Sequence, residues 1–311
     1  MTLTELRYIV AVAQERHFGR AAQRSFVSQP TLSIAIKKLE EELGVSLFDR
    51  SSNEVITTEA GERIVMQARR VLEEAERIKT LANEEQNELE GVFKLGLIFT
   101  VAPYLLPKLI VTLRGIAPQM PLQLDENHTE SLTDALKKGD LDAAVVAEPF
   151  HEPGIVTTPL YDEAFFVIVP KGHEFEELDA VSSRALANQQ VLLLNEGNCM
   201  RDQIIESCSE LAARQKVHGL TNTIQGSSIN TVRHMVASGL GISILPSSAL
   251  TDNDHLLFSI IPFELPAPQR RIILASRRHF VRPKALNAIR QAVLQSQLAG
   301  VSFIHEAAEA S

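Results

Sequence analysis

Residues 18–51, FGRAAQRSFVSQPTLSIAIKKLEEELGVSLFDRS, decide the first domain of this 311-residue chain. Apolar side chains recur there at helical spacing, at Leu32, Ile36, Leu39 and Leu43. Ser28 is placed to cap the N-terminus of this helix, and Gly44 is placed to end it. Two shorter helices are predicted before it, from Leu6 and from Phe18. The stretch 47–58 then predicts two short strands around Ser51-Ser52-Asn53, which would form a wing.

This segment predicts a DNA-binding surface. A helix, a tight turn and a second helix that opens with small polar residues is the geometry that places a recognition helix in the major groove. The side chains that would reach base edges are Ser28, Gln29, Thr31 and Ser33. Phosphate contacts would come from Arg20, Arg24, Lys37, Lys38 and, on the wing, Arg50. The alternative is a small helical domain with solvated arginines.

The distribution of charge supports a nucleic-acid contact at one end only. The chain carries a net charge of −9, yet residues 1–38 hold six Lys or Arg side chains against Glu5 and Glu15. A basic segment on an acidic protein suits phosphate binding by that segment and another role for the remainder. From these residues alone, two interpretations of residues 1–58 stay open: a winged helix-turn-helix domain that binds double-stranded DNA, and a small helical domain with solvated arginines.

A long helix is expected over residues 59–90, because the stretch lacks proline and has glycine only near its start. Its apolar positions alternate in steps of four and three, at Ile64, Ala68, Val71, Ala75, Ile78 and Ala82. This heptad seam predicts a dimerisation helix. Packing of the helix on its own domain is the alternative.

Beyond Gly91, apolar strand-like runs alternate with helical stretches. This βαβ rhythm indicates a parallel sheet covered by helices. We expect residues 91–311 to form a two-lobe α/β domain, with lobe I at about 91–162 and 268–311 and lobe II at about 163–267. The fold class is thus mixed α and α/β.

Several classes of protein are excluded or disfavoured. No apolar run approaches the roughly 18 residues of a membrane-spanning helix. The N-terminal segment is amphipathic and lacks the pattern of a secretory signal, so we expect a cytoplasmic protein without a membrane partner. HExxH, G-x-S-x-G, P-loop and CxxC motifs do not occur, and the nine histidines lack ligand spacing. We expect no enzyme activity, metal or cofactor.

The residues quoted above, followed by the T-x-x-G of Thr58 and Gly61, closely resemble the winged helix-turn-helix of the LysR-type transcriptional regulators. The segment 238–246, SGLGISILP, is similar to the effector domain of that family. The resemblance implies a linker-helix dimer, usually assembled as a homotetramer, with a periplasmic-binding-protein-like effector domain. It also implies transcription regulation through contact with RNA polymerase.

Two cysteines, Cys199 and Cys208, are the candidate redox groups. If a helix follows Asn198, Cys199 lies in its first turn, where the helix dipole favours thiolate, and Arg201 adds positive charge. Nine helical residues span roughly 13.5 Å, whereas bridged cysteines need Cα atoms within about 7 Å. A disulfide would therefore require local unfolding. The alternative is a pair of inert, partly buried thiols.

The segment G-x-C-x-R-D-Q at residues 197–203, with a second cysteine at 208, resembles the hydrogen-peroxide-sensing branch of the same family. The resemblance implies that peroxide oxidises Cys199, that Cys208 resolves it as a disulfide, and that Thr100 and Thr129 help to hold peroxide. Thr129 could instead cap a helix. The resemblance further implies an activator of antioxidant genes and a glutaredoxin- or thioredoxin-like reductant. Arg270 and Arg271 match the family too, although a solvated pair would explain them equally well.

One position departs from the pattern. The family often has histidine directly before the reactive cysteine, and this chain has Asn198, which cannot titrate near neutrality. Two other functions remain open from the sequence. The protein could be a LysR-type regulator that binds a small organic ligand between its lobes, or a thiol peroxidase, which the N-terminal recognition helix disfavours.

Overall fold

The structure is a computed structural model of the whole chain, and it describes residues 1–49, 55–82, 88–208 and 225–305. These residues form two compact units, one of Met1–Asn87 with His279–Val281 and one of Glu88–Arg278 with Arg282–Ser311. Each unit is described by itself below.

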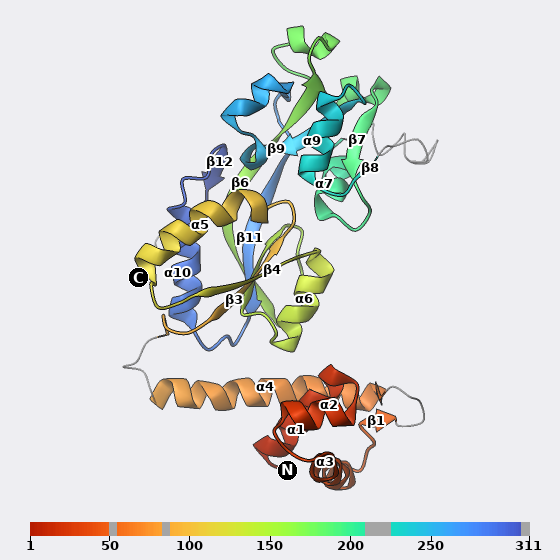
Figure 1. Cartoon of the computed structure of the whole chain (residues 1–311), viewed down its shortest axis with the longest axis vertical. Helices are drawn as coiled ribbons and strands as arrows, with labels where there is room; N and C mark the ends of the chain where they lie inside the picture. The colour runs from red at the N-terminus through yellow and green to blue at the C-terminus, as the bar shows by residue number, and fades with distance from the viewer. Residues whose placement is uncertain (50–54, 83–87, 209–224, 306–311) are drawn as a thin grey trace. The chain divides into compact units, whose positions relative to one another are not determined.

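The N-terminal unit opens with three helices, α1 (Leu3–Glu15), α2 (Phe18–Arg24) and α3 (Gln29–Leu43) (Figure 1). Their sequence-based assignment is confirmed, including both caps of α3. The Ser28 side chain accepts a hydrogen bond from the backbone N–H of Thr31, and Gly44 ends the helix with a left-handed φ of 71°. The buried side of α3, with Leu32, Ile36 and Leu39, closes a core shared with α1 and α2.

Two short strands follow, β1 (Phe48–Asp49) and β2 (Ile56–Thr57), paired antiparallel as expected for a wing. The tip of that wing, with Arg50, lies outside the described residues.

The T-x-x-G motif of Thr58 and Gly61 holds the junction between the wing and the next helix. Thr58 Oγ1 donates to the Ser46 carbonyl at 2.7 Å and accepts from the Gly61 N–H. A Cβ on Gly61 would lie 2.1 Å from the Leu47 carbonyl, so only glycine fits there.

Helix α4 (Glu59–Ala82) carries the heptad seam. The expectation that it extends to residue 90 is wrong, because Glu88 and Leu89 form a turn. The Glu88 and Glu90 carbonyls there accept hydrogen bonds from the Arg282 guanidinium instead of helical N–H groups. In this single chain, part of the heptad seam is buried and part is exposed to solvent. Ala68 is buried in the core of the unit, whereas Val71 and Ile78 are 36% and 68% exposed.

The larger unit contains one curled sheet with the strand order β4-β3-β5-β11-β6-β9-β7-β8, and β10 and β12 pair with β6. The strands are β3 (Phe93–Ile98), β4 (Leu122–Asn127), β5 (Ala143–Ala147), β6 (Ile155–Pro170), β7 (Val191–Leu194), β8 (Gln225–Gly226), β9 (Ile242–Pro246), β10 (Phe258–Pro262), β11 (Gln269–Arg277) and β12 (Val301–Phe303). The helices are α5 (Ala102–Ile116), α6 (Thr129–Lys138), α7 (Cys199–Ser207), α9 (Ile229–Ala237) and α10 (Pro283–Leu294). Figure 1 shows α6 on the opposite side of the sheet from α5 and α10.

The expectation of a parallel sheet holds only in part. The β3–β4, β3–β5, β7–β8 and β7–β9 pairs are parallel, as the βαβ rhythm predicts. The pairs of β11 with β5 and β6, and of β6 with β9, β10 and β12, are antiparallel. The long strand β6 runs through both halves of the unit, and its partners β11, β9, β10 and β12 all run in the opposite direction to it. Strand β6 pairs with β11 as far as Ala164 and with β9 from Phe165 onward.

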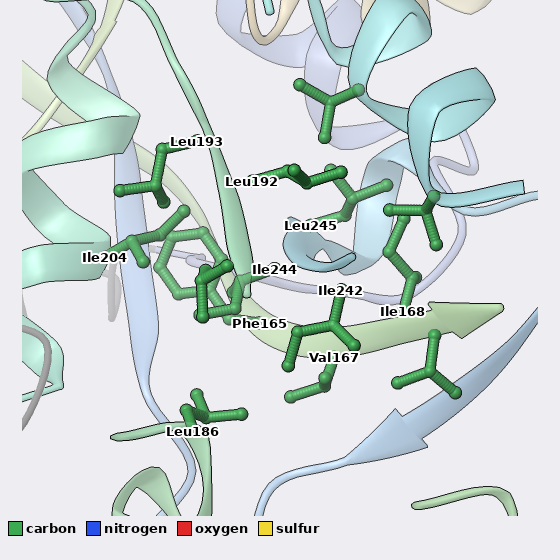
Figure 2. Close-up of a cluster of buried hydrophobic side chains, with 14 of the residues drawn as sticks. Phe165, Val167, Ile168, Leu186, Leu192, Leu193, Ile204, Ile242, Ile244 and Leu245 are labelled. Carbon is green, nitrogen blue, oxygen red and sulfur yellow. The ribbon is translucent and has the colours of Figure 1, made fainter. Parts of the chain in front are cut away.

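The second half of the unit has its own hydrophobic core, which holds helix α7 in place. Side chains from β6, β7 and β9 gather in it, among them Phe165, Leu192 and Ile244 (Figure 2). Ile204 brings the buried side of α7 into the same cluster, and Cys208 belongs to it as well. Helix α7 is therefore attached to this core along its length, with Cys199 at its N-terminus.

Candidate functional site

Cys199 is the first residue of α7, and its surroundings are set by the turn that leads into the helix. Gly197 adopts a left-handed φ of 84°, which favours glycine. Asn198 is the N-cap, and its buried side-chain oxygen accepts a hydrogen bond from the Met200 N–H at 3.1 Å. The residue that departs from the family pattern thus has a capping role that asparagine performs well.

A small compartment lies at the half-buried Cys199. Nine residues line it: Ile98, Phe99, Thr100, Asn127, His128, Thr129, Gly197, Asn198 and Cys199. It leaves about 10 Å³ for the centres of water-sized molecules. A cavity of this size holds about one water molecule. The loop after β3, the start of α6 and the start of α7 meet here, so Thr100, Thr129 and Cys199 are brought together as the resemblance implied.

The hydroxyl group of Thr129 makes no hydrogen bond to any of the described protein atoms. The alternative interpretation of this residue, an N-cap, is wrong, because the cap of α6 is His128 and Thr129 is the first helical residue. Its Oγ1 atom is buried and has no hydrogen-bond partner among the described residues. The hydroxyl therefore remains available to a molecule in the compartment.

Thr100 is held by a buried ion pair. Arg270 Nη1 donates to Thr100 Oγ1 at 2.9 Å and Nη2 donates to the Thr100 carbonyl at 3.2 Å. Arg270 Nε donates to Glu163 Oε1 at 2.8 Å, and both charged side chains are fully buried. Because Thr100 Oγ1 accepts from Arg270, its own O–H is left to donate elsewhere. The interpretation of Arg270 as one of a solvated pair is wrong.

Arg201 does not line the compartment. Its guanidinium is almost fully buried and donates to the Leu194 carbonyl at 2.8 Å, and Glu196 lies at 4.0 Å. The carbonyl and the carboxylate take up the positive charge that the sequence placed near Cys199. Arg201 therefore fixes the strand-to-helix connection between β7 and α7.

Cys208 lies at the other end of α7, as its C-cap, and no disulfide joins the two cysteines. It is only 1% exposed, packs in the hydrophobic core of the second half, and its Sγ lies 3.9 Å from Ser183 Oγ. The nine-residue helix that separates the cysteines spans roughly 13.5 Å, beyond the reach of a disulfide. A bridge would require α7 to unwind.

Two larger openings flank α7. One of about 500 Å³ reaches Cys199 and is lined mainly by polar or charged residues of α6 and α7, including Glu130, Lys137 and Asp202, and by His151. The other, of about 580 Å³, lies near Gln203, Glu206 and Arg271. Ligand pockets for organic molecules are mostly apolar. Neither of the two openings has a mainly apolar lining.

The DNA-facing candidates are exposed, with Ser33 half-buried. Arg24 pairs with Glu15 at 2.9 Å, and Arg20 donates to the Glu15 carbonyl, so these arginines have intramolecular partners to exchange for phosphate. Ser28 and Thr31 share a hydrogen bond of 2.7 Å at the start of α3. Gln29, Lys37 and Lys38 are also exposed on α3, and Lys37 Nζ lies 3.8 Å from Glu41 Oε1.

Sequence reasoning missed two residues at the Cys199 site. Glu163 lies 107 positions from Arg270 and carries no local motif. His128 lines the compartment, although only its place before a predicted helix could have indicated it.

Within the residues that the structure describes, no group of His, Cys, Asp or Glu side chains could hold a metal ion. Among the same residues, none of the helices combines the length and the hydropathy that a bilayer crossing requires.

Comparison with known families matches both parts of the chain. Residues 3–62 match the bacterial regulatory helix-turn-helix protein, lysR family, and residues 86–297 match the LysR substrate binding domain. The chain belongs to the LysR family of bacterial regulators. Its fold is a winged helix-turn-helix, a long helix and a two-lobe α/β domain.

Within that family the chain is similar to OxyR regulators. It is 38% identical over 280 residues to the hydrogen peroxide-inducible genes activator of Dickeya chrysanthemi, covering 89% of this chain and 90% of the relative. The reduced form of OxyR from N. meningitidis is 74% identical with a TM-score of 0.68, covering 70% of this chain and all of that one. Full-length OxyR C199D from Pseudomonas aeruginosa is 45% identical with a TM-score of 0.84, and 99% of each chain is covered.

Proposed function

We propose that the protein is a DNA-binding transcriptional regulator that senses hydrogen peroxide through Cys199. The observation that carries the proposal is the compartment at Cys199, which has room for about one small molecule and offers the hydroxyl groups of Thr100 and Thr129. Its relatives include a hydrogen peroxide-inducible activator, which agrees with this chemistry.

The proposed reaction has two steps. The Cys199 thiolate attacks one peroxide oxygen, an S–O bond forms, the O–O bond breaks, and the departing hydroxide takes up a proton to become water. The Cys208 thiol then attacks the sulfenic sulfur, the S–S bond forms, and a second water leaves. A cellular dithiol of the glutaredoxin or thioredoxin class would reverse the bridge.

The two thiols react in this order because of where α7 holds them. Cys199 faces the compartment and is half-buried, whereas Cys208 is buried in the apolar core. Disulfide formation must pull Cys208 out of that core and unwind α7. Oxidation would thereby convert a local reaction into a change of effector-domain conformation and assembly, in a dimer or tetramer that contacts RNA polymerase.

Mass spectrometry of the alkylated full-length protein, before and after micromolar peroxide, tests the proposal. Wild type should lose two hydrogens, Cys208→Ala should gain oxygen at residue 199, and Cys199→Ser should gain none there. A DNA footprint should change on oxidation in wild type alone. Wild-type protein that keeps both thiols under micromolar peroxide would refute the sensor.

The same experiment distinguishes the other candidates. A thiol peroxidase would turn over many equivalents of peroxide with a reductant, whereas the proposed sensor uses one equivalent for each slow reduction. A regulator of the organic-ligand type would change its footprint without oxidation. We favour the peroxide sensor because neither larger opening has the apolar lining typical of organic-ligand sites.

A further inference from the structure

Among the residues that the structure describes, three histidines are N-caps of helices, and one of them makes no capping hydrogen bond with its side chain. His17 and His173 each cap their helix through Nδ1, which accepts a backbone N–H at 3.0 and 3.1 Å. His128 occupies the same position before α6 but makes no capping hydrogen bond with its side chain. Its ring packs edge-on against Phe99, with 5.1 Å between ring centroids. The His128 ring is therefore not used to hold its helix.

His128 is also a residue of the compartment at Cys199. His128 and Phe99 are both among the nine residues that line it. Of those nine, only His128 and Cys199 have side chains with an acid–base group, an imidazole and a thiol. Thr100 and Thr129 supply hydroxyl groups, but a hydroxyl cannot give up a proton at neutral pH without a base.

Peroxide cleavage needs such a proton. When the thiolate displaces one oxygen, the other leaves as hydroxide unless a donor protonates it, and a positioned general acid accelerates such a step. We propose that the His128 imidazolium donates this proton. The S–O bond forms, the O–O bond breaks, water leaves, and neutral imidazole remains, which regains a proton from solvent because His128 is exposed.

Charged side chains lie on each of the elements that meet at the compartment: Glu126 of β4, Glu130 of α6, Glu196 before α7, Arg201 and Asp202 of α7, and Arg270 behind Thr100. Both cations have an acidic partner, Glu196 for Arg201 and Glu163 for Arg270.

The test compares two reactions of Cys199 in the full-length Cys208→Ala protein, in which oxidation stops before a disulfide. Peroxide oxidation needs a proton for the leaving oxygen, whereas alkylation by iodoacetamide releases iodide and needs none. His128→Gln should slow peroxide oxidation at least about tenfold, within the range of lost general acids. The alkylation rate should stay within about twofold. His151→Gln, in the open cleft beside Cys199, is the matched control and should change neither rate.

The pH profile provides a second readout. With His128, the peroxide rate should rise as the thiol ionises and fall as the imidazolium loses its proton, giving a bell. In His128→Gln the descending limb should disappear. Equal slowing of both reactions would assign His128 a structural role, and an unchanged peroxide rate would also overturn the inference. The inference rests on the proposed function, but the two fail differently: wild-type Cys199 that does not react with peroxide would refute the sensor itself.

Discussion

Arg270 and Arg271 are neighbours on β11, and each pairs with the acidic residue directly across the ladder on β6. The Arg270–Glu163 pair is fully buried and holds Thr100, whereas in the Arg271–Asp162 pair the two side chains are 42% and 22% exposed. Successive residues of a strand point to opposite faces of the sheet. The two arginine–carboxylate pairs are therefore of the same kind, but one lies in the protein interior and the other at the surface. The difference teaches that burial, and not the ion pair itself, makes Arg270 a structural part of the redox site.

The same contrast separates the two units. The candidate DNA contacts of α2 and α3 are mostly exposed and would act by reaching a partner. The groups around Cys199 are largely buried and would act through fixed positions. Substitutions should therefore affect stability in the second region and affinity in the first.

The largest effect should follow from breaking the buried pair. Glu163→Ala leaves Arg270 buried without its counter-charge and should lower the free energy of unfolding by about 3–5 kcal/mol. Urea denaturation of the reduced full-length protein measures this. Asp162→Ala is the matched control one position away, and an equal loss in both variants would remove the distinction drawn from burial.

The exposed part of the α4 seam should behave as a buried site in the assembly. Val71→Glu would place like charges across a dimer and should weaken self-association by about a hundredfold, within the cost of an unpaired buried charge. Sedimentation at a series of concentrations checks this. Wild-type association of the variant would assign the seam to packing within its own unit, the alternative to dimerisation.

On the recognition surface, Lys38→Ala should weaken binding to all DNA sequences alike. It should also reduce the slope of log affinity against log salt concentration by about one, because one phosphate contact is lost. Gln29→Ala should instead relax base preference. Filter binding or anisotropy over a salt series separates the two, and a changed operator choice for Lys38→Ala would contradict this assignment.

The smallest effect should come from the exposed pair. Arg271→Ala removes a surface salt bridge and should change the free energy of unfolding by at most about 1 kcal/mol. The same urea measurement applies. A loss as large as that of Glu163→Ala would show that exposure is a poor guide on this ladder.

Local features of the chain could be predicted from the sequence because their causes lie within a few residues. The caps Ser28 and Gly44 act on the helix beside them, and the helix that starts at Cys199 follows from Asn198. The alternative of Thr129 as a cap was off by one residue, because α6 begins one residue earlier than that role requires and His128 takes the N-cap position without a side-chain hydrogen bond. The end of the long helix was also misplaced, because Arg282 binds residues 88–90 from almost 200 positions away.

The sequence by itself determined the order of the helices, the winged helix-turn-helix, the two-lobe α/β domain and the separation of the cysteines by a helix. Only the tertiary structure decided which side chains share the compartment. Thr100, His128 and Cys199 meet there because β3, α6 and α7 converge, and the Arg270–Glu163 pair forms because β11 runs antiparallel to β6. The apolar periodicity of a segment shows which of its faces is buried, but it does not show which distant segment that face meets.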